Sequence, residues 1–105
     1  ATVKVTDLLN VNPLLVDRVR LTIMANLALA GGPVEFNTLL EELELTKGNL
    51  STHLRKLEEA ELITVHKEFV GRKPRSTYVC TAQGKKEMRS YLSTIEALLK
   101  NNAIK

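Results

Sequence analysis

The spacing of large apolar residues predicts an amphipathic helix over residues 47–60. Leu50, Leu54 and Leu57 recur at i, i+4 and i+7, which places them on one stripe of a helix. Thr46, directly before this run, is a suitable N-cap residue, so we expect the helix to open out of a short turn. The face opposite the leucines is small, polar and basic except at its far end, and it consists of Gly48, Ser51, Thr52, Arg55, Lys56 and Glu59.

Beyond residue 62 the period of the pattern changes to two, which predicts a β-hairpin over residues 62–80. The positions expected to face inward are Ile63, Val65, Phe69, Tyr78 and Cys80. Residues 71–75, Gly-Arg-Lys-Pro-Arg, supply turn chemistry between the strands, because Gly permits a positive φ and Pro fixes its own. The tip of the hairpin is therefore expected to carry three cations that core packing does not require, namely Arg72, Lys73 and Arg75.

A helix is also expected near the N-terminus, over residues 13–30. Asn12 and Pro13 are typical of an N-cap followed by a first helical position. The Gly-Gly-Pro sequence at residues 31–33 ends this helix. Its inward stripe consists of Leu15, Val19, Ile23 and Leu27.

A very short strand at residues 34–36 and a second helix over residues 37–44 are expected next. Asn37 or Thr38 is the expected N-cap of this helix, and three glutamates lie on its surface. Because only two residues separate it from the helix over 47–60, the two form a helix-turn-helix unit. In this unit the acidic first helix supports the basic second one.

The final helix is expected over residues 82–100, with Thr81 as its N-cap, and residues 101–105 are expected to form a frayed tail. Its apolar stripe is wider than one small domain requires, which favours contact with a second copy of the chain in a two-fold dimer. The apolar residues among 1–12 are expected to be covered by their own domain or by a second chain. The residues expected at the dimer interface are Leu8, Leu9, Met88, Tyr91, Leu92, Ile95, Leu98 and Leu99.

Length and charge narrow the classes of protein. A chain of 105 residues corresponds to one domain with a modest core, and a hydrophobic content of 44% excludes general disorder. The net charge of +3 is too small to indicate a nucleic acid partner by itself. However, residues 1–46 hold three Lys/Arg and six Asp/Glu, whereas residues 47–105 hold twelve and six. The second half is therefore the candidate polyanion-binding surface.

Few residues are suited to metal or covalent chemistry. Cys80 is the only cysteine and is expected to be a small buried hydrophobic residue, and His53, one of two histidines, is expected to be half-buried. We expect no metal, no cofactor and no enzymatic activity, because the chain has no ligand cluster, phosphate loop or nucleophile motif. No apolar run is long enough for a membrane span and no signal-peptide pattern opens the chain, so the cytoplasm is the expected location.

Four segments together resemble the winged helix-turn-helix domains of MarR-like and ArsR-like bacterial and archaeal transcriptional regulators. They are DRVRLTIMANL, LTKGNLSTHLRKLEEAELI, FVGRKPRSTYVCT and TAQGKK, and the resemblance covers residues 13 to 90. It implies a winged-helix fold, mainly α with a small antiparallel β-hairpin, in a single domain over residues 1–105. In that family the helix that matches 47–60 enters the DNA major groove, and the hairpin tip that matches 71–75 touches the backbone or the minor groove.

One residue departs from the pattern of this family. The family usually has Gly directly after the helix that matches residues 47–60, where this chain has Glu61. A non-Gly residue in a left-handed helix cap costs about 1 kcal/mol. We therefore expect the end of the helix, and with it the angle of the hairpin, to be reshaped here.

These patterns predict a sequence-specific, double-stranded-DNA-binding transcriptional regulator that acts as a homodimer. The candidate DNA-binding residues are Lys47, Asn49, Ser51, Thr52, Arg55, Lys56, Arg72, Lys73 and Arg75. Arg55 and Asn49 have the fork and amide geometries that reach the edges of guanine and adenine. The alternative is a winged-helix module that binds a protein partner rather than specific DNA. A third interpretation is a switch controlled by an unknown effector bound between the dimer helices and the domain.

Overall fold

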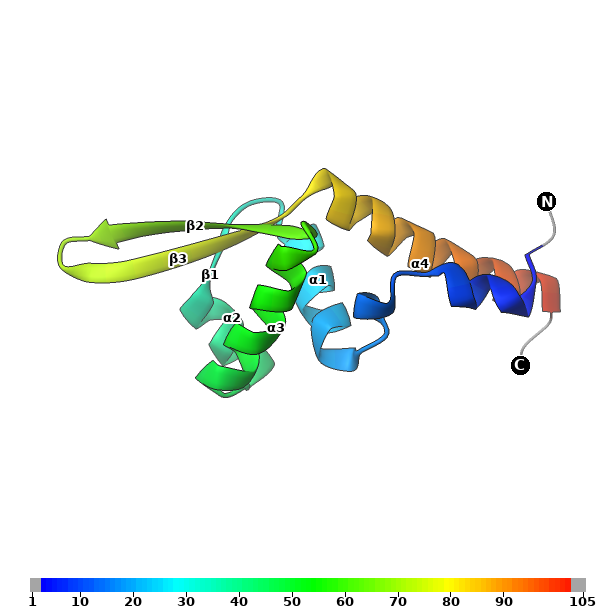
Figure 1. Cartoon of the computed structure of the whole chain (residues 1–105), viewed down its shortest axis with the longest axis horizontal. Coiled ribbons are helices and arrows are strands. Elements are labelled where there is room, and N and C mark those ends of the chain that lie inside the picture. The colour runs from blue at the N-terminus through cyan, green and yellow to red at the C-terminus, as the bar shows by residue number, and fades with distance from the viewer. Residues whose placement is uncertain (1–2, 103–105) are drawn as a thin grey trace.

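The computed structural model describes residues 3–102, which form a mainly helical domain with one small antiparallel sheet (Figure 1). In chain order the elements are the 3₁₀ helices η1 (Val5–Asn10) and η2 (Pro13–Leu15), α1 (Arg18–Ala30), β1 (Val34–Glu35), α2 (Phe36–Leu43), α3 (Lys47–Glu59), β2 (Ile63–Val70), β3 (Lys73–Cys80) and α4 (Ala82–Asn102). The fold is the winged helix-turn-helix expected from the sequence. Residues 1–2 and 103–105 of the expected termini lie outside the described residues.

The core sits between α1, α2, α3 and the base of the hairpin. The apolar stripe predicted for residues 47–60 is confirmed, because Leu50, Leu54 and Leu57 are all buried in this core. The N-terminal helix adds Ile23, Met24 and Leu27, and the hairpin adds Leu62, Ile63, Tyr78 and Cys80. The recurrent leucines therefore pin one face of α3 to the domain and leave the opposite face at the surface.

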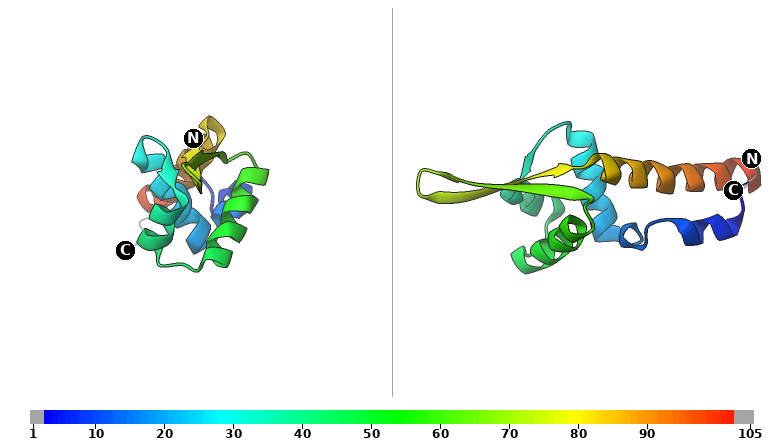
Figure 2. Two further views of the ribbon diagram at one scale, coloured as in Figure 1. Left: turned by 90° about the vertical axis from the view of Figure 1, so that its left-hand side faces the viewer. Right: turned by 45° about the horizontal axis from the view of Figure 1, so that its top comes forward.

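The sheet has the strand order β1-β3-β2, and both pairings are antiparallel. The very short strand expected at residues 34–36 is present as β1, and its two residues pair with Thr77 and Tyr78. The β2–β3 pairing runs from Ile63↔Cys80 out to Val70↔Lys73. This hairpin (residues 63–80) is called the wing below, and its outer half projects beyond the rest of the domain (Figures 1 and 2).

Three expected element boundaries are corrected. The first long helix begins at Arg18 instead of residue 13, because Asn12 caps only a 3₁₀ turn while Asp17 accepts hydrogen bonds from the amides of Val19 and Arg20. The second helix begins one residue early, at Phe36, and its N-cap is Glu35. The final helix continues past residue 100 to Asn102.

The wing also differs from its expected form. Strand β3 begins at Lys73, so the turn contains only Gly71 and Arg72, and Lys73 and Arg75 lie in a strand. Gly71 has φ +66° and is the first turn residue, which is the position where a type II′ hairpin turn needs Gly. Phe69, expected to face inward, is 75% exposed, because the domain ends before the strand does.

The long α4 and the N-terminal segment together form an arm that extends away from the wing (Figures 1 and 2). The molecule measures 55 × 25 × 21 Å along its principal axes, which reflects this elongation. The N-terminal helix η1 contacts α4 of its own chain, but this contact buries none of its residues, so its apolar side chains are covered only in part. Met88 and Leu98, two of the residues expected at the dimer interface, are 6% exposed and so are already buried within one chain.

Candidate nucleic-acid interface

Helix α3 is held rigidly at both ends. At its start, Thr46 Oγ1 accepts a hydrogen bond of 3.2 Å from the amide of Asn49, as its predicted N-cap role requires. At its end, the amide of Leu62 donates to the carbonyl of Leu57 at 3.0 Å and that of Glu61 to Glu58 at 2.9 Å. This pair of bonds is a Schellman motif, and Glu61 takes its left-handed position with φ +61°. The helix end expected to be reshaped thus keeps the left-handed geometry that Gly usually occupies.

All six candidate residues on α3 are exposed: Lys47, Asn49, Ser51, Thr52, Arg55 and Lys56. Thr52 Oγ1 donates to the carbonyl of Gly48 at 2.9 Å, which leaves its methyl group and an acceptor oxygen toward solvent. Arg55 Nε lies 3.9 Å from Glu59 Oε1, but both side chains are about two-thirds exposed, so the pair holds Arg55 only weakly. The face opposite the leucines is therefore a free surface of donors and acceptors.

The cations of the wing differ in their surroundings. Arg75 Nη2 lies 3.0 Å from Glu35 Oε1, and its Nε lies 3.7 Å from Glu68 Oε1. Among residues 3–102, Arg72 and Lys73 form no ion pair. Among the described residues, the unpaired cations of the wing are thus Lys67 in β2, Arg72 in the turn and Lys73 at the start of β3, while Arg75 ties the wing to β1.

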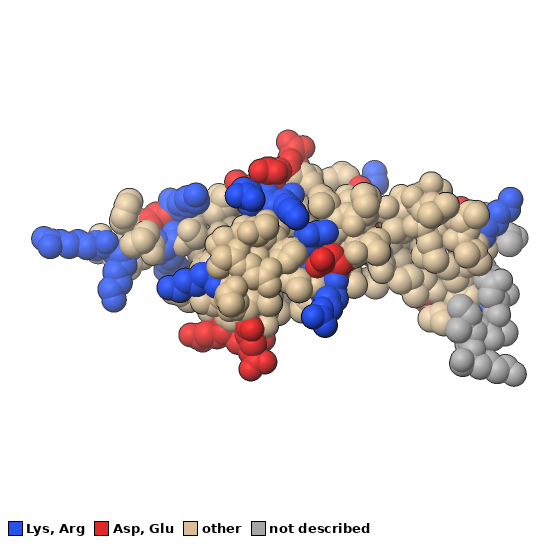
Figure 3. Space-filling model, turned by 60° about the horizontal axis from the view of Figure 1, so that its bottom comes forward, with Lys and Arg blue, Asp and Glu red and all other residues tan. Residues whose placement is uncertain are grey.

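Charge is distributed unevenly over the surface. In the view of Figure 3, Lys and Arg atoms gather on the wing at the left and around the middle of the molecule, while the arm at the right is mostly uncharged on this face. The exposed glutamates Glu41, Glu42 and Glu44 belong to α2 and the turn after it. Helix α2 therefore carries acidic residues and no Lys or Arg, whereas α3 carries Lys47, Arg55 and Lys56, with Glu58 and Glu59 at its end.

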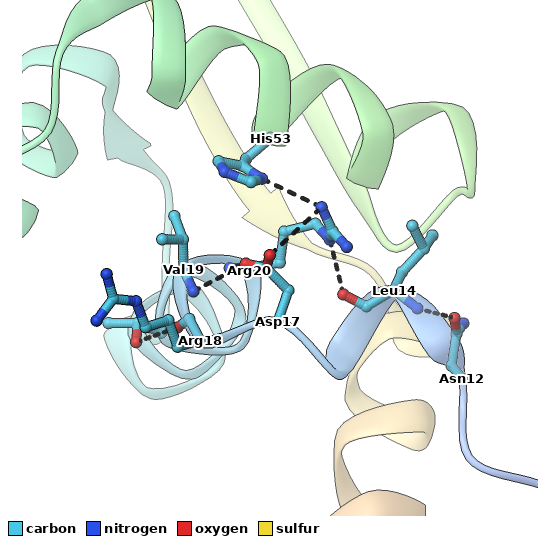
Figure 4. A network of polar contacts seen from close by, with 8 residues as sticks. Asn12, Leu14, Asp17, Arg18, Val19, Arg20 and His53 are labelled. Carbon is cyan, nitrogen blue, oxygen red and sulfur yellow. Dashed lines mark hydrogen bonds and ion pairs between the residues drawn. The ribbon is translucent and has the colours of Figure 1, made fainter. Parts of the chain in front are cut away.

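A polar network joins α1 to α3, and sequence reasoning did not find it (Figure 4). Arg20 Nε donates to the carbonyl of Leu14 at 2.8 Å, and Nη1 lies 3.2 Å from His53 Nδ1 and 3.9 Å from Asp17 Oδ2. Because a guanidinium can only donate, the Nδ1 atom of His53 must accept. The sequence predicted only that His53 is half-buried, which is confirmed. No local pattern relates two residues that are 33 positions apart.

The buried titratable groups of the hairpin base are packing residues. Cys80 is 4% exposed, and burial raises the pKa of its thiol although Lys85 opposes the shift. The pKa of Tyr78 is also raised, mainly by burial and further by the charge of Glu58. Cys80 therefore has little thiolate at neutral pH and is the buried hydrophobic residue that the sequence predicted.

The arm carries apolar groups that its own chain does not cover. Leu9 is 83% exposed, Leu92 54%, Leu99 48% and Leu8 38%, whereas Tyr91 and Ile95 are half-buried. Val5 on the same segment is 69% exposed. Between α1 and α4 lies an open hollow of about 400 Å³ with a mainly apolar lining that includes Ala28, Leu29 and Leu92.

The described part of the chain contains no group of three or more His, Cys, Asp or Glu residues arranged to hold a metal ion. A search of the same residues finds no helix that is both long and apolar enough to cross a membrane.

Comparison with known proteins identifies the family. The family model for winged helix DNA-binding domains matches residues 19–99. The chain therefore belongs to the winged helix DNA-binding domains. It is 37% identical over 67 residues to an uncharacterised protein of Methanocaldococcus jannaschii, a match that covers 64% of this chain and 73% of that protein.

Solved structures agree with this family. A transcriptional regulator homologue from Pyrococcus horikoshii superposes with a TM-score of 0.80 at 29% identity, over 94% of this chain and 96% of that one. Bacillus subtilis PadR, solved in complex with operator DNA, gives a TM-score of 0.64 at 18% identity, over 72% of this chain and 48% of PadR. The second likeness shows the fold alone. The family and fold are those of DNA-binding transcriptional regulators, which confirms the winged-helix regulator expected from the sequence.

Proposed function

We propose that this protein is a transcriptional regulator that binds specific double-stranded DNA sequences as a homodimer. The observation that carries the proposal is the position of α3, which is pinned by three buried leucines and turns six exposed polar residues outward. Helix α3 enters the major groove, and the wing contacts the backbone or the minor groove. PadR, which has a similar fold, was solved in complex with operator DNA, and this supports the proposed mode of binding.

Different residues read and anchor the DNA in this proposal. Arg55 and Asn49 contact base edges, guanine for the guanidinium and adenine for the amide. The exposed methyl group of Thr52 suits a thymine methyl, since its hydroxyl hydrogen is engaged within the helix. Lys47, Ser51 and Lys56 on α3 contact phosphates or the edges of guanine or adenine. The wing contributes further contacts of this kind through Arg72, Lys73 and Arg75.

The dimer forms through the arm. The arm exposes Val5, Leu8 and Leu9 on η1 and Leu92 and Leu99 on α4, and α4 also carries half-buried Tyr91 and Ile95. A two-fold axis at the arm would present two α3 helices to successive major-groove faces, about 34–36 Å apart. Light scattering tests this step, and a monomer mass at all concentrations would contradict it.

The first experiment is fluorescence anisotropy of a labelled mixed-sequence duplex titrated with the protein across a salt series. We expect binding to weaken steeply with salt because the basic residues displace counterions. Arg55→Ala should relax preference at one base position, whereas Lys73→Ala should weaken binding to all sequences and lower the salt slope by about 1. Lys100→Ala is a control for the loss of one positive charge at the far end of the arm, where Lys100 pairs with Glu96 at 2.9 Å. If Arg55→Ala and Lys73→Ala lost equal affinity for every sequence, the assignment of base reading to Arg55 and of anchoring to Lys73 would be wrong.

The alternative function is a winged-helix module that binds a protein partner. In that case the mixed-sequence duplex should not bind even at low salt, and a hydrophobic interface should depend little on salt. The proposal also includes an effector. The hollow between α1 and α4 offers space for such a ligand. A ligand bound there would act through the arm, because the described residues form one domain and no separate effector domain.

A further inference from the structure

Phe69 is the most exposed aromatic residue of the wing, with 75% of its surface in contact with solvent. It lies in β2 opposite Pro74 of β3, one pair before the pair Val70↔Lys73 that closes the turn. Strand alternation places it on the face that buries Ile63 at the base of the hairpin. The same face of the hairpin thus packs in the core at its base and exposes an apolar side chain to solvent near its tip.

The pairing with Pro74 holds the side chain of Phe69 in a defined position. In a two-residue hairpin the pair next to the turn, Val70↔Lys73, is hydrogen-bonded, so the next pair, Phe69↔Pro74, is not. Pro74 therefore loses no ladder hydrogen bond at this position. Side chains of a non-hydrogen-bonded pair approach each other more closely, so the pyrrolidine ring supports the phenyl ring from one side.

The residues that flank Phe69 indicate what covers it. Arg72 and Lys73 follow within four positions and form no ion pair among residues 3–102. Strand β1 pairs only with Thr77 and Tyr78, so it does not extend along the outer part of the hairpin (Figure 1). An apolar ring next to two free cations matches the minor groove, where phosphates border apolar deoxyribose walls.

We propose that Phe69, supported by Pro74, is a non-ionic DNA contact of the wing, which packs in the minor groove beside phosphates held by Arg72 and Lys73. This inference rests on the proposed function and adds a determinant of sequence preference to it. The minor groove of B-DNA is about 6 Å wide, too narrow for a two-stranded ribbon with side chains. The groove must therefore open, and that costs least at flexible pyrimidine–purine steps such as TA.

The test uses two labelled duplexes of equal length, one with TA steps and one with a stiff A-tract at the same positions. Anisotropy is measured across a salt series for the wild type and for F69A, F69L and K73A. We expect F69A to bind the TA duplex about tenfold more weakly with an unchanged salt slope, because no charge is removed. F69L should retain most of the affinity, and K73A should lower the salt slope by about 0.9.

Two outcomes would overturn the inference while leaving the proposed function intact. One is wild-type binding that F69A leaves unchanged on both duplexes. The other is an equal loss on both duplexes that accompanies a lower thermal stability of F69A, since that result would assign Phe69 only a role in strand packing. Failure of the wild type to bind either duplex at low salt would instead overturn the proposed function, and this inference with it.

Discussion

The hydroxyl of Thr81 joins the end of α3 to the start of α4, because its Oγ1 donates a hydrogen bond of 2.7 Å to the carbonyl oxygen of Glu61. The same oxygen accepts a bond of 2.9 Å from the amide of Gly84, as the predicted N-cap role requires. The amide of Thr81 also donates to the carbonyl of Leu62 at 3.0 Å. One residue thus couples α3 to the arm through both its side chain and its backbone.

Removing this hydroxyl should destabilise the domain. Thr81→Val keeps the shape of the side chain but loses the cap and leaves the Glu61 carbonyl without its partner, so we expect a loss of about 1–2 kcal/mol in the free energy of unfolding. Thr81→Ser keeps the hydroxyl and should stay within about 0.5 kcal/mol of the wild type. Urea denaturation measures both, and equal stability of the Val and Ser variants would contradict the bridging role.

Gly84 should tolerate no side chain. A Cβ atom at this position would overlap the carbonyl oxygen of Leu62 and lie 2.9 Å from Cys80 Sγ and 3.0 Å from Met24 Cε. We expect Gly84→Ala to cost about 3 kcal/mol or more, because backbone and core must both shift. Gly48→Ala is the matched control: nothing lies within 4 Å of its Cβ, and helix propensity predicts a gain of about 0.5–1 kcal/mol. Thermal unfolding of both variants tests the contrast.

Glu61 is a site where a substitution should stabilise the protein. Its φ of +61° strains a residue with a Cβ, whereas Gly adopts this conformation freely. Because the bond from Thr81 uses the backbone carbonyl, Glu61→Gly keeps it, and we expect a gain of about 1 kcal/mol in chemical denaturation. Glu61→Ala removes the charge but retains the strain. A gain of the same size in the Ala variant would show that charge, not backbone strain, is responsible.

The stability of the N-terminal half should depend on pH through Asp17. Hydrogen bonds from the amides of Arg20 and Val19, together with the charge of Arg20, lower the pKa of this carboxyl below its ordinary value of 3.8. A lowered pKa contributes stability that is fully present above pH 3.8 and is lost as the pH falls through the folded-state value. Asp17→Asn should therefore be less stable than the wild type at neutral pH, by about 0.5 kcal/mol.

The measurement for Asp17 is urea denaturation at a series of pH values. Asn is also a good N-cap residue, so the difference between the two proteins reports the charge. That difference should shrink as the pH falls below 3.8. A difference that stays constant across this range would contradict the role assigned to the ionised carboxylate.

The local patterns of the sequence predicted the fold because the interactions that form these elements act over a few residues. The leucine stripe of α3, the caps at Thr46 and Thr81 and the end of α1 at Gly31 each depend on neighbours within one or two helical turns. The start of α1 was predicted wrongly, since Asn12 and Asp17 are both capable caps. The side chain of Arg20, which reaches the Leu14 carbonyl across this break, contributes a contact that no local pattern reveals.

Periodicity assigns a residue to a face, and only the tertiary structure decides whether that face is covered. Phe69 lies at an inward position of the strand alternation but is exposed, because the hairpin extends beyond the domain on which it packs. Met88 and Leu98 have the spacing of a dimer stripe but are buried within one chain. Likewise, Arg75 and Arg72 are both cations near the tip, yet Glu35 from a distant strand pairs only with Arg75. The sequence alone thus determined the elements and the family, while contacts between distant segments determined which of their residues remain free to bind.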